Sequence, residues 1–192
     1  MEIVESLKPD NSCAGEFSVI RIWVLRLMAV YRGHGKLGAL TAYLDEDAET
    51  LLDACGLMSK AMQSSNPRTV SAELRKLRKA AEEDGCSALL PATLLANVQC
   101  LAKLVCLSET ECRLLEFSVM MFEDSRFRAI CDAMGSLTTI QLYQLLAVVL
   151  DLPESDIRLS LSGQSALIRS GLLSVERIGR DRLSSKLELL ST

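Results

Sequence analysis

The chain is poor in histidine and in aromatic residues: its 192 residues include one histidine, His34, and only 4% Phe, Trp and Tyr. A metal site with histidine ligands, a Ser–His pair or a Cys–His pair would each have to use His34. None of the seven cysteines forms a C-x-x-C pair, which argues against a zinc ribbon, and their odd number argues against a disulfide framework. These absences leave little room for catalytic or metal chemistry.

Export and membrane signals are also missing. The chain begins with the acidic run Met1–Glu5, where a signal peptide would carry basic residues. The most apolar segments, residues 17–31 and 86–102, are too short or too polar to cross a bilayer. Most cysteines, such as Cys100 and Cys106, lie in apolar helical stretches, so we expect them to pack in the core. We therefore predict a cytoplasmic protein without a membrane-spanning segment.

Nucleotide-binding and hydrolase motifs are absent. The sequence contains no G-x-x-x-x-G-K-[ST], H-E-x-x-H or G-x-S-x-G motif. The letters G-x-G-x-x-G do occur at Gly33–Gly38, but a dinucleotide site needs a strand before them, and the preceding residues have helical spacing. We interpret these glycines as a helix C-cap followed by a loop. We expect no cofactor, no metal and no enzyme activity in this chain.

What the sequence has is helical periodicity. Capping boxes at Ser108/Glu111 and Thr138/Gln141 mark two helix starts, and apolar residues and helix-end signals elsewhere predict further helices. The helices expected are 17–32, 45–58, 67–84, 91–106, 109–124, 126–134, 140–150 and 154–161. Residues 165–169 are expected to form a turn, and 172–178 alternate as a strand does.

This order of elements predicts an all-α fold with two units. Residues 1–107 would form an N-terminal helical unit, and 108–178 a winged-helix-like unit with one short strand or hairpin. Residues 179–192 are expected to be a linker or helix.

Two charged clusters are candidate partner-binding sites. The first, on the helix over 67–84, consists of Arg75, Lys76, Arg78 and Lys79. Because Arg78 and Lys79 each precede a glutamate by four residues, a solvated face with intrahelical ion pairs is the favoured interpretation, and a binding patch is the alternative. The second cluster consists of Glu154, Asp156 and Arg158, at the start of the helix that would be the recognition helix of a winged helix.

The charge of the winged-helix-like unit tests the possibility of DNA binding. Residues 108–178 contain six arginines, no lysine and ten acidic residues. The net charge of this unit is therefore -4, the same as that of the whole chain. Glu154 and Asp156 would face the phosphates of a duplex. The unit is therefore expected to bind protein or to pack, and not to bind nucleic acid.

Several segments resemble a known family. They are Leu90-Pro91-Ala92-Thr93-Leu94-Leu95-Ala96-Asn97, Leu101-Ala102-Lys103-Leu104, Leu107-Ser108-Glu109-Thr110-Glu111, Ser170-Gly171-Leu172-Leu173 and Ser185-Lys186-Leu187-Glu188-Leu189-Leu190. They resemble the region ahead of the ATPase module in large bacterial AAA family ATPases. Arg21-Ile22-Trp23-Val24-Leu25-Arg26 matches more loosely.

The resemblance implies that the chain is the N-terminal region of an ATP-binding parent protein, and that the linker or helix over 179–192 leads toward a missing ATPase module. In such enzymes this region recognises substrate or adaptor proteins or regulates the ring. The expected partner is therefore a protein or the attached AAA motor, with oligomers forming only through the motor. Two alternatives stay open: a free-standing winged-helix DNA-binding transcription regulator, and a helical oligomerisation scaffold.

Overall fold

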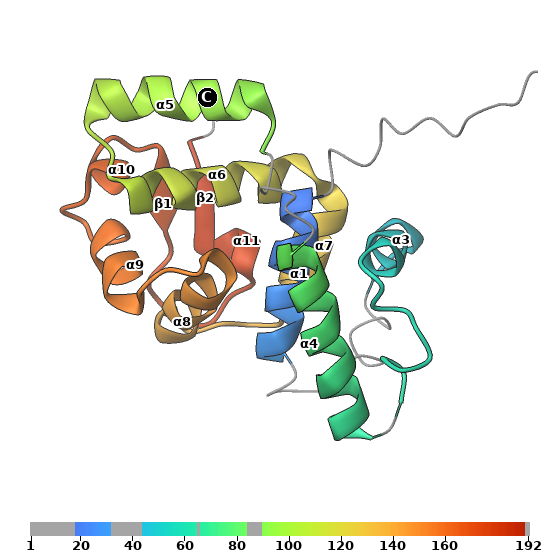
Figure 1. The fold of residues 1–192 in the computed structure, drawn as a ribbon. Helices are drawn as coiled ribbons and strands as arrows, with labels where there is room; N and C mark the ends of the chain where they lie inside the picture. Colours follow the sequence, from blue (N-terminus) through green and yellow to red (C-terminus); the bar gives the residue numbers. More distant parts are fainter. Residues whose placement is uncertain (1–17, 32–43, 65, 84–89, 191–192) are drawn as a thin grey trace, which may run out of the picture.

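The computed structural model describes residues 18–31, 44–64, 66–83 and 90–190, and this part of the chain is mostly helical with a small antiparallel sheet (Figure 1). The predicted helical class is therefore confirmed at this level. The helices described are α1 (Ser18–Tyr31), α3 (Glu46–Ala54), α4 (Pro67–Glu83), α5 (Ala92–Val105), α6 (Glu109–Glu123), α7 (Ser125–Asp132), α8 (Thr139–Leu150), α9 (Glu154–Ser160), α10 (Ala166–Arg169) and α11 (Leu183–Lys186). The Gly33–Gly38 segment and His34 lie outside the described residues.

The predicted helix starts are confirmed by their cap geometry. The Glu111 carboxylate accepts a hydrogen bond from the Ser108 amide at 2.7 Å, and the Ser108 hydroxyl accepts one from the Glu111 amide. Thr138 and Gln141 form the second capping box in the same way. Asn66 accepts a hydrogen bond from the Arg68 amide at the start of α4. Local sequence therefore determines where these helices begin.

The second helix is shorter than predicted, because α3 ends at Ala54 and not near residue 58. Gly56 follows with a φ of +80°, a conformation that other residues rarely adopt. A Cβ atom at this position would also lie 3.0 Å from the Leu77 side chain of α4. The glycine thus ends α3 and lets the chain pass close to α4.

The sheet consists of β1 (Leu173–Val175) and β2 (Leu187–Leu189), which pair antiparallel with Leu173 opposite Leu189. The strand predicted over 172–178 is therefore present but shorter, and residues 166–169, expected to be a turn, form α10. The linker or helix expected over 179–192 is wrong for residues 187–189. Leu187-Glu188-Leu189 does alternate, but three residues become a strand only when a partner strand is available.

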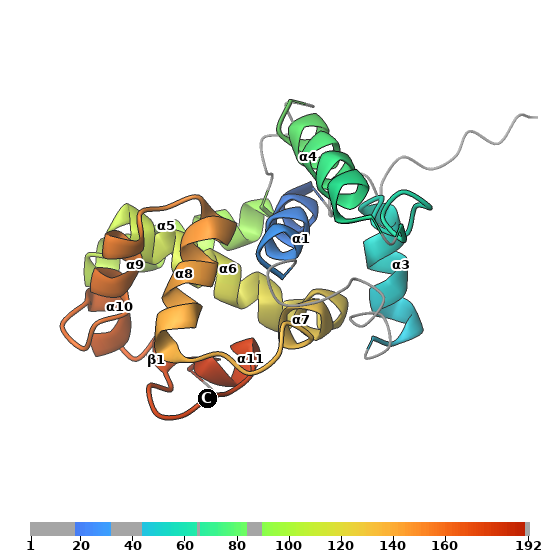
Figure 2. The same cartoon turned by 90° about the horizontal axis from the view of Figure 1, so that it is seen from below.

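The core joins the two expected units. Trp23 of α1 packs against Phe117 of α6 and Phe127 of α7, with ring centroids 5.2 and 5.9 Å away. Helix α1 lies against α4, α7 and α8 (Figure 2). The predicted boundary at residue 107 falls in the turn between α5 and α6, but the buried apolar residues of the described ranges form one cluster across it. The two-unit division stays a prediction.

Candidate functional site

Three of the four residues of the basic cluster lie on the solvent side of α4, and Arg78 is half-buried. Arg75, Lys76 and Lys79 are exposed, while α4 buries Val70, Leu74 and Ala81. Lys79 forms an ion pair with Glu83 at 3.5 Å and Lys76 pairs with Glu73 at 3.8 Å. These pairs are the ones that a solvated helix face makes. The choice between a solvated face and a binding patch stays a prediction.

The acidic cluster of α9 is also largely used within the helix. Glu154 accepts a hydrogen bond from Arg158 Nε at 2.9 Å, and the Arg158 guanidinium lies over the ring of Tyr143 at 5.2 Å. Asp156 accepts a hydrogen bond from the hydroxyl of Ser155. Helices α4 and α9 lie on different sides of the molecule in both views, so the two predicted clusters do not form one site (Figures 1 and 2).

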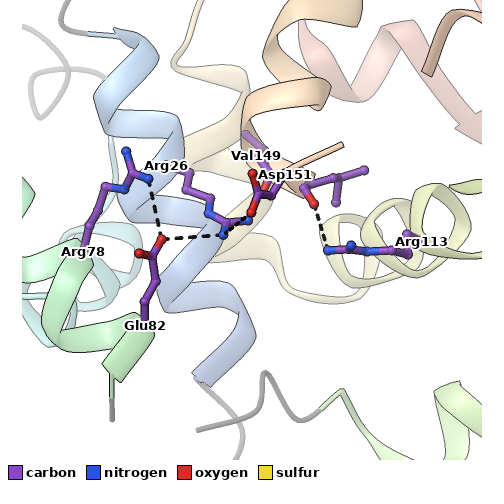
Figure 3. A network of polar contacts seen from close by, with 7 residues as sticks. Arg26, Arg78, Glu82, Arg113, Val149 and Asp151 are labelled. Carbon is purple, nitrogen blue, oxygen red and sulfur yellow. Dashed lines mark hydrogen bonds and ion pairs between the residues drawn. The ribbon is translucent and has the colours of Figure 1, made fainter. Parts of the chain in front are cut away.

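A polar junction that sequence reasoning missed connects α1, α4, α6 and α8 (Figure 3). Arg26 of α1 donates a hydrogen bond to the carbonyl of Val149 at 3.0 Å and lies 3.6 Å from the Glu82 carboxylate. Glu82 also pairs with Arg78 of the basic cluster at 3.5 Å. Arg78 is therefore a junction residue and differs in this respect from Lys76 and Lys79.

Two arginines at this junction cap the carboxyl end of α8. Arg113 of α6 donates a hydrogen bond to the carbonyl of Leu150 at 2.8 Å, next to the Val149 carbonyl that Arg26 binds (Figure 3). The last carbonyls of a helix have no partner within it, and positive charge is favourable there. The sequence signal for this role was the presence of two arginines, Arg21 and Arg26, inside the apolar stretch of residues 17–31.

Glu111 binds a second helix besides its own. It is buried, and its second carboxylate oxygen accepts a hydrogen bond from the Leu167 amide at the start of α10 at 3.0 Å. Burial alone would raise the pKa of Glu111, but the hydrogen bonds from the Leu167 and Ser108 amides and the Ser108 hydroxyl outweigh it and lower the pKa. The carboxylate is thus held ionised and acts as a structural cap.

Asp132 and Lys186 likewise form hydrogen bonds with backbone groups of the segments next to the sheet. Asp132 of α7 accepts hydrogen bonds from the Ser184 amide and hydroxyl at 3.0 and 2.7 Å, at the start of α11. Lys186 is fully buried, and its ammonium group donates to the carbonyls of Glu176, Ile178 and Gly179. All three ammonium protons therefore have an acceptor in the loop after β1.

The buried thiols are poor nucleophiles. Burial raises the pKa of Cys55 to about 12, although the charge of Arg21 acts in the opposite direction, and burial raises the pKa of Cys131 as well. The prediction of core packing is confirmed for these two cysteines. It is wrong for Cys100 and Cys106, which are exposed because one side of α5 faces solvent.

Helix α5 is apolar and yet lies on the outside of the molecule. Ten of its fourteen residues are apolar, but Val98 is the one residue of this fully described helix that is buried. It packs mainly on α6 (Figure 1). Ala92, Ala96, Cys100 and Leu104 follow one another at intervals of four residues and are exposed, which places them along one stripe. We call these four residues the outer face of α5.

Within the described residues, no group of His, Cys, Asp and Glu side chains is arranged to hold a metal ion. None of the helices in the same ranges is long and apolar enough to span a membrane. Comparisons with protein-family models, with curated proteins and with solved structures gave no significant match to the chain.

Proposed function

We propose that the chain is the non-catalytic N-terminal domain of an AAA family ATPase, and that it recognises a substrate or adaptor protein or regulates the motor. The observation that carries this proposal is the outer face of α5. A helix with ten apolar residues that buries one of them presents apolar surface to solvent, and such surface is typical of a protein-binding site. Leu104, at its end, is 73% exposed.

The position of α5 in the sequence supports the same proposal. Residues 90–97 and 101–104, which carry part of the resemblance to AAA family ATPases, lie mostly within this helix, Ala92–Val105. If these residues had been selected only for packing, most of their apolar side chains would be buried. Their exposure is better explained by a protein partner that covers them.

The winged-helix-like fold of residues 108–178 belongs to this proposal. Helices α6, α7, α8, α9 and the short α10 precede β1, and β2 follows α11 beyond residue 178 and pairs with β1. An isolated bridge joins Leu137 to Asp181. Helix α9 has seven residues, of which Glu154 and Asp156 are acidic. This short acidic helix favours a protein-binding winged helix over a DNA-binding one.

The experiment compares two leucines of nearly equal exposure. The reading frame after the Thr192 codon should continue into a phosphate-loop motif, and the module encoded there should bind the 192-residue chain in calorimetric titration. Leu104→Lys should weaken this binding about tenfold, or about 1.4 kcal/mol. Leu159→Lys is the matched control, because Leu159 is 70% exposed on α9.

Several outcomes would contradict the proposal. A stop codon after Thr192, or equal binding by the Leu104→Lys variant and the control, would remove its basis. ATP turnover by the purified chain would contradict the non-catalytic role. Binding of random duplex DNA that weakens steeply with salt would favour the transcription regulator, and a stable oligomer of the chain alone, measured by light scattering, would favour the scaffold.

A further inference from the structure

A groove lies where the first turn of α5 meets the end of α6, and α1, α3 and α7 complete its walls. It encloses about 750 Å³, which lies within the range of about 300–1,000 Å³ that is common for ligand sites. A space of this size accommodates several side chains and exceeds what a single ion needs. Its residues come from both sides of residue 107, so the groove exists only in the folded molecule.

The bottom of the groove is apolar. Leu94 and Val119 are half-buried, and Ile20 and Met120, which also line the groove, are buried. Thr93 and Asn97 stand at the edge and are exposed. Such a surface favours an aliphatic or aromatic side chain, with polar groups around it that can bind peptide groups.

The charge of the groove is negative. Asp47 at the start of α3 and Glu123 at the end of α6 are exposed, and within the described ranges neither carboxylate has a hydrogen bond or ion pair. Arg126 also lines the groove, but Asp124 binds its guanidinium through two hydrogen bonds of 3.1 and 2.8 Å. The two unpaired carboxylates therefore determine the charge that a ligand would meet.

The first turn of α5 supplies hydrogen-bond donors. Its N-cap is Pro91, which has no side chain that can accept a hydrogen bond from the amides that follow. The amides of Thr93 and Leu94, two residues that line the groove, have no acceptor within the described part of the chain. Backbone carbonyls of an extended peptide are suitable acceptors for them.

We propose that the groove binds an extended peptide segment in which apolar side chains alternate with lysine or arginine. The apolar side chain would occupy the surface formed by Leu94 and Val119, and the basic side chain would pair with Glu123 or Asp47. This inference rests on the proposed function, since it names the class of segment that a substrate or adaptor would present. It concerns a surface different from the outer face of α5.

The test uses a fluorescein-labelled peptide, Gly-Gly-Leu-Arg-Leu-Arg-Leu-Gly-Gly, and the 192-residue chain. Fluorescence anisotropy should show binding of this peptide, and a loss of about tenfold or more when its arginines are replaced by glutamate or its leucines by serine. Glu123→Lys should weaken binding of the first peptide by a similar factor. Thr93→Trp should abolish it, because the indole would fill the groove from an exposed position.

The controls separate a binding defect from a folding defect. An acidic residue at the end of a helix opposes the helix dipole, so Glu123→Lys should not destabilise α6. Glu188→Lys makes the same change of charge at an exposed position on β2 and should leave the affinity unchanged. Circular dichroism of each variant should match that of the parent chain.

The groove proposal fails if the basic peptide does not bind, if the acidic or serine peptide binds equally well, or if Glu123→Lys and Glu188→Lys have the same effect. Competition by single-stranded DNA would also contradict it, because unpaired carboxylates repel phosphates. None of these results would bear on the outer face of α5, whose test uses Leu104 and the downstream module. Failure of one proposal is therefore distinguishable from failure of the other.

Discussion

The two ends of the described chain are stabilised in different ways. Helices α1 and α4 have 14 and 17 residues and bury apolar side chains against their neighbours. Their polar contacts are the Arg26–Glu82 ion pair between them and pairs such as Lys79–Glu83 on the exposed side. Helices α10 and α11 have four residues each, and buried or half-buried carboxylates of Glu111 and Asp132 bind their first amides.

This difference follows from length. A helix of four residues leaves all of its first amides without an internal acceptor and buries little apolar surface. Each of these short helices forms here because a helix that precedes it in the sequence, α6 or α7, presents a carboxylate to its first amides. Long helices bury enough apolar surface to form without such a carboxylate. Removal of a polar side chain should therefore lower the free energy of unfolding by different amounts in the two regions.

The largest effect is expected from Phe117→Ala, because Phe117 is fully buried and its ring contacts those of Trp23 in α1 and Phe127 in α7. The free energy of unfolding should fall by about 3–5 kcal/mol. Trp23 is the one tryptophan of the sequence, so its fluorescence reports on this contact. In urea, the fluorescence and circular dichroism transitions should shift together; separate transitions would show that the two regions unfold independently. Leu159→Ala, at an exposed site, is the control.

An intermediate effect is expected from Glu111→Gln, which should lower the free energy of unfolding by about 1–3 kcal/mol at neutral pH. Because the pKa of Glu111 is lowered in the folded state, its stabilisation is present above about pH 4.3, the ordinary value for glutamate, and is lost as pH falls through the folded-state pKa. The difference between parent and variant should therefore shrink on acidification.

Two neighbouring carboxylates, Glu116 and Glu109, help to interpret the pH dependence of the free energy of unfolding. Burial raises the pKa of Glu116 against the charge of Arg113, so its contribution has the opposite sign and favours the folded state at low pH. Glu109→Gln is the control for Glu111→Gln, because Glu109 lies in the same first turn but is exposed. A gap between parent and Glu111→Gln that stays constant from about pH 6 to about pH 3 would contradict the structural role of the carboxylate.

The smallest effect is expected from Lys79→Ala on the exposed side of α4. Loss of the ion pair with Glu83 should change the free energy of unfolding by about 0.3–0.5 kcal/mol and less at high salt. Urea unfolding at low and high ionic strength measures this. If Lys79→Ala lowered the free energy of unfolding as much as Glu111→Gln does, the two regions would not differ in how polar contacts stabilise them.

Much of the fold was predictable because it depends on local signals. The capping boxes at Ser108 and Thr138 predicted the starts of α6 and α8 correctly. The errors concern elements that need a distant partner. Residues 187–189 become a strand through pairing with residues 173–175, and α10 is bound by the distant Glu111 carboxylate besides its local cap, Ser165.

The candidate sites show the same division. The spacing of Arg78 and Lys79 to Glu82 and Glu83 predicted ion pairs within α4, and both pairs are present. Spacing could not show that Glu82 also lies near Arg26, 56 positions earlier in the chain. The exposure of Cys100 and Leu104 was equally hidden, because an apolar residue gives no sign in the sequence of whether its side of the helix is covered.

The sequence by itself determined where most helices begin and the balance of charge along the chain, because caps, glycines and ionised groups act over one or two turns. The tertiary structure decided which charged groups bind other helices, which apolar helix face stays exposed, and which residues meet in the groove beside α5. Those features depend on contacts between segments far apart in the chain, and such contacts form only when the whole core assembles.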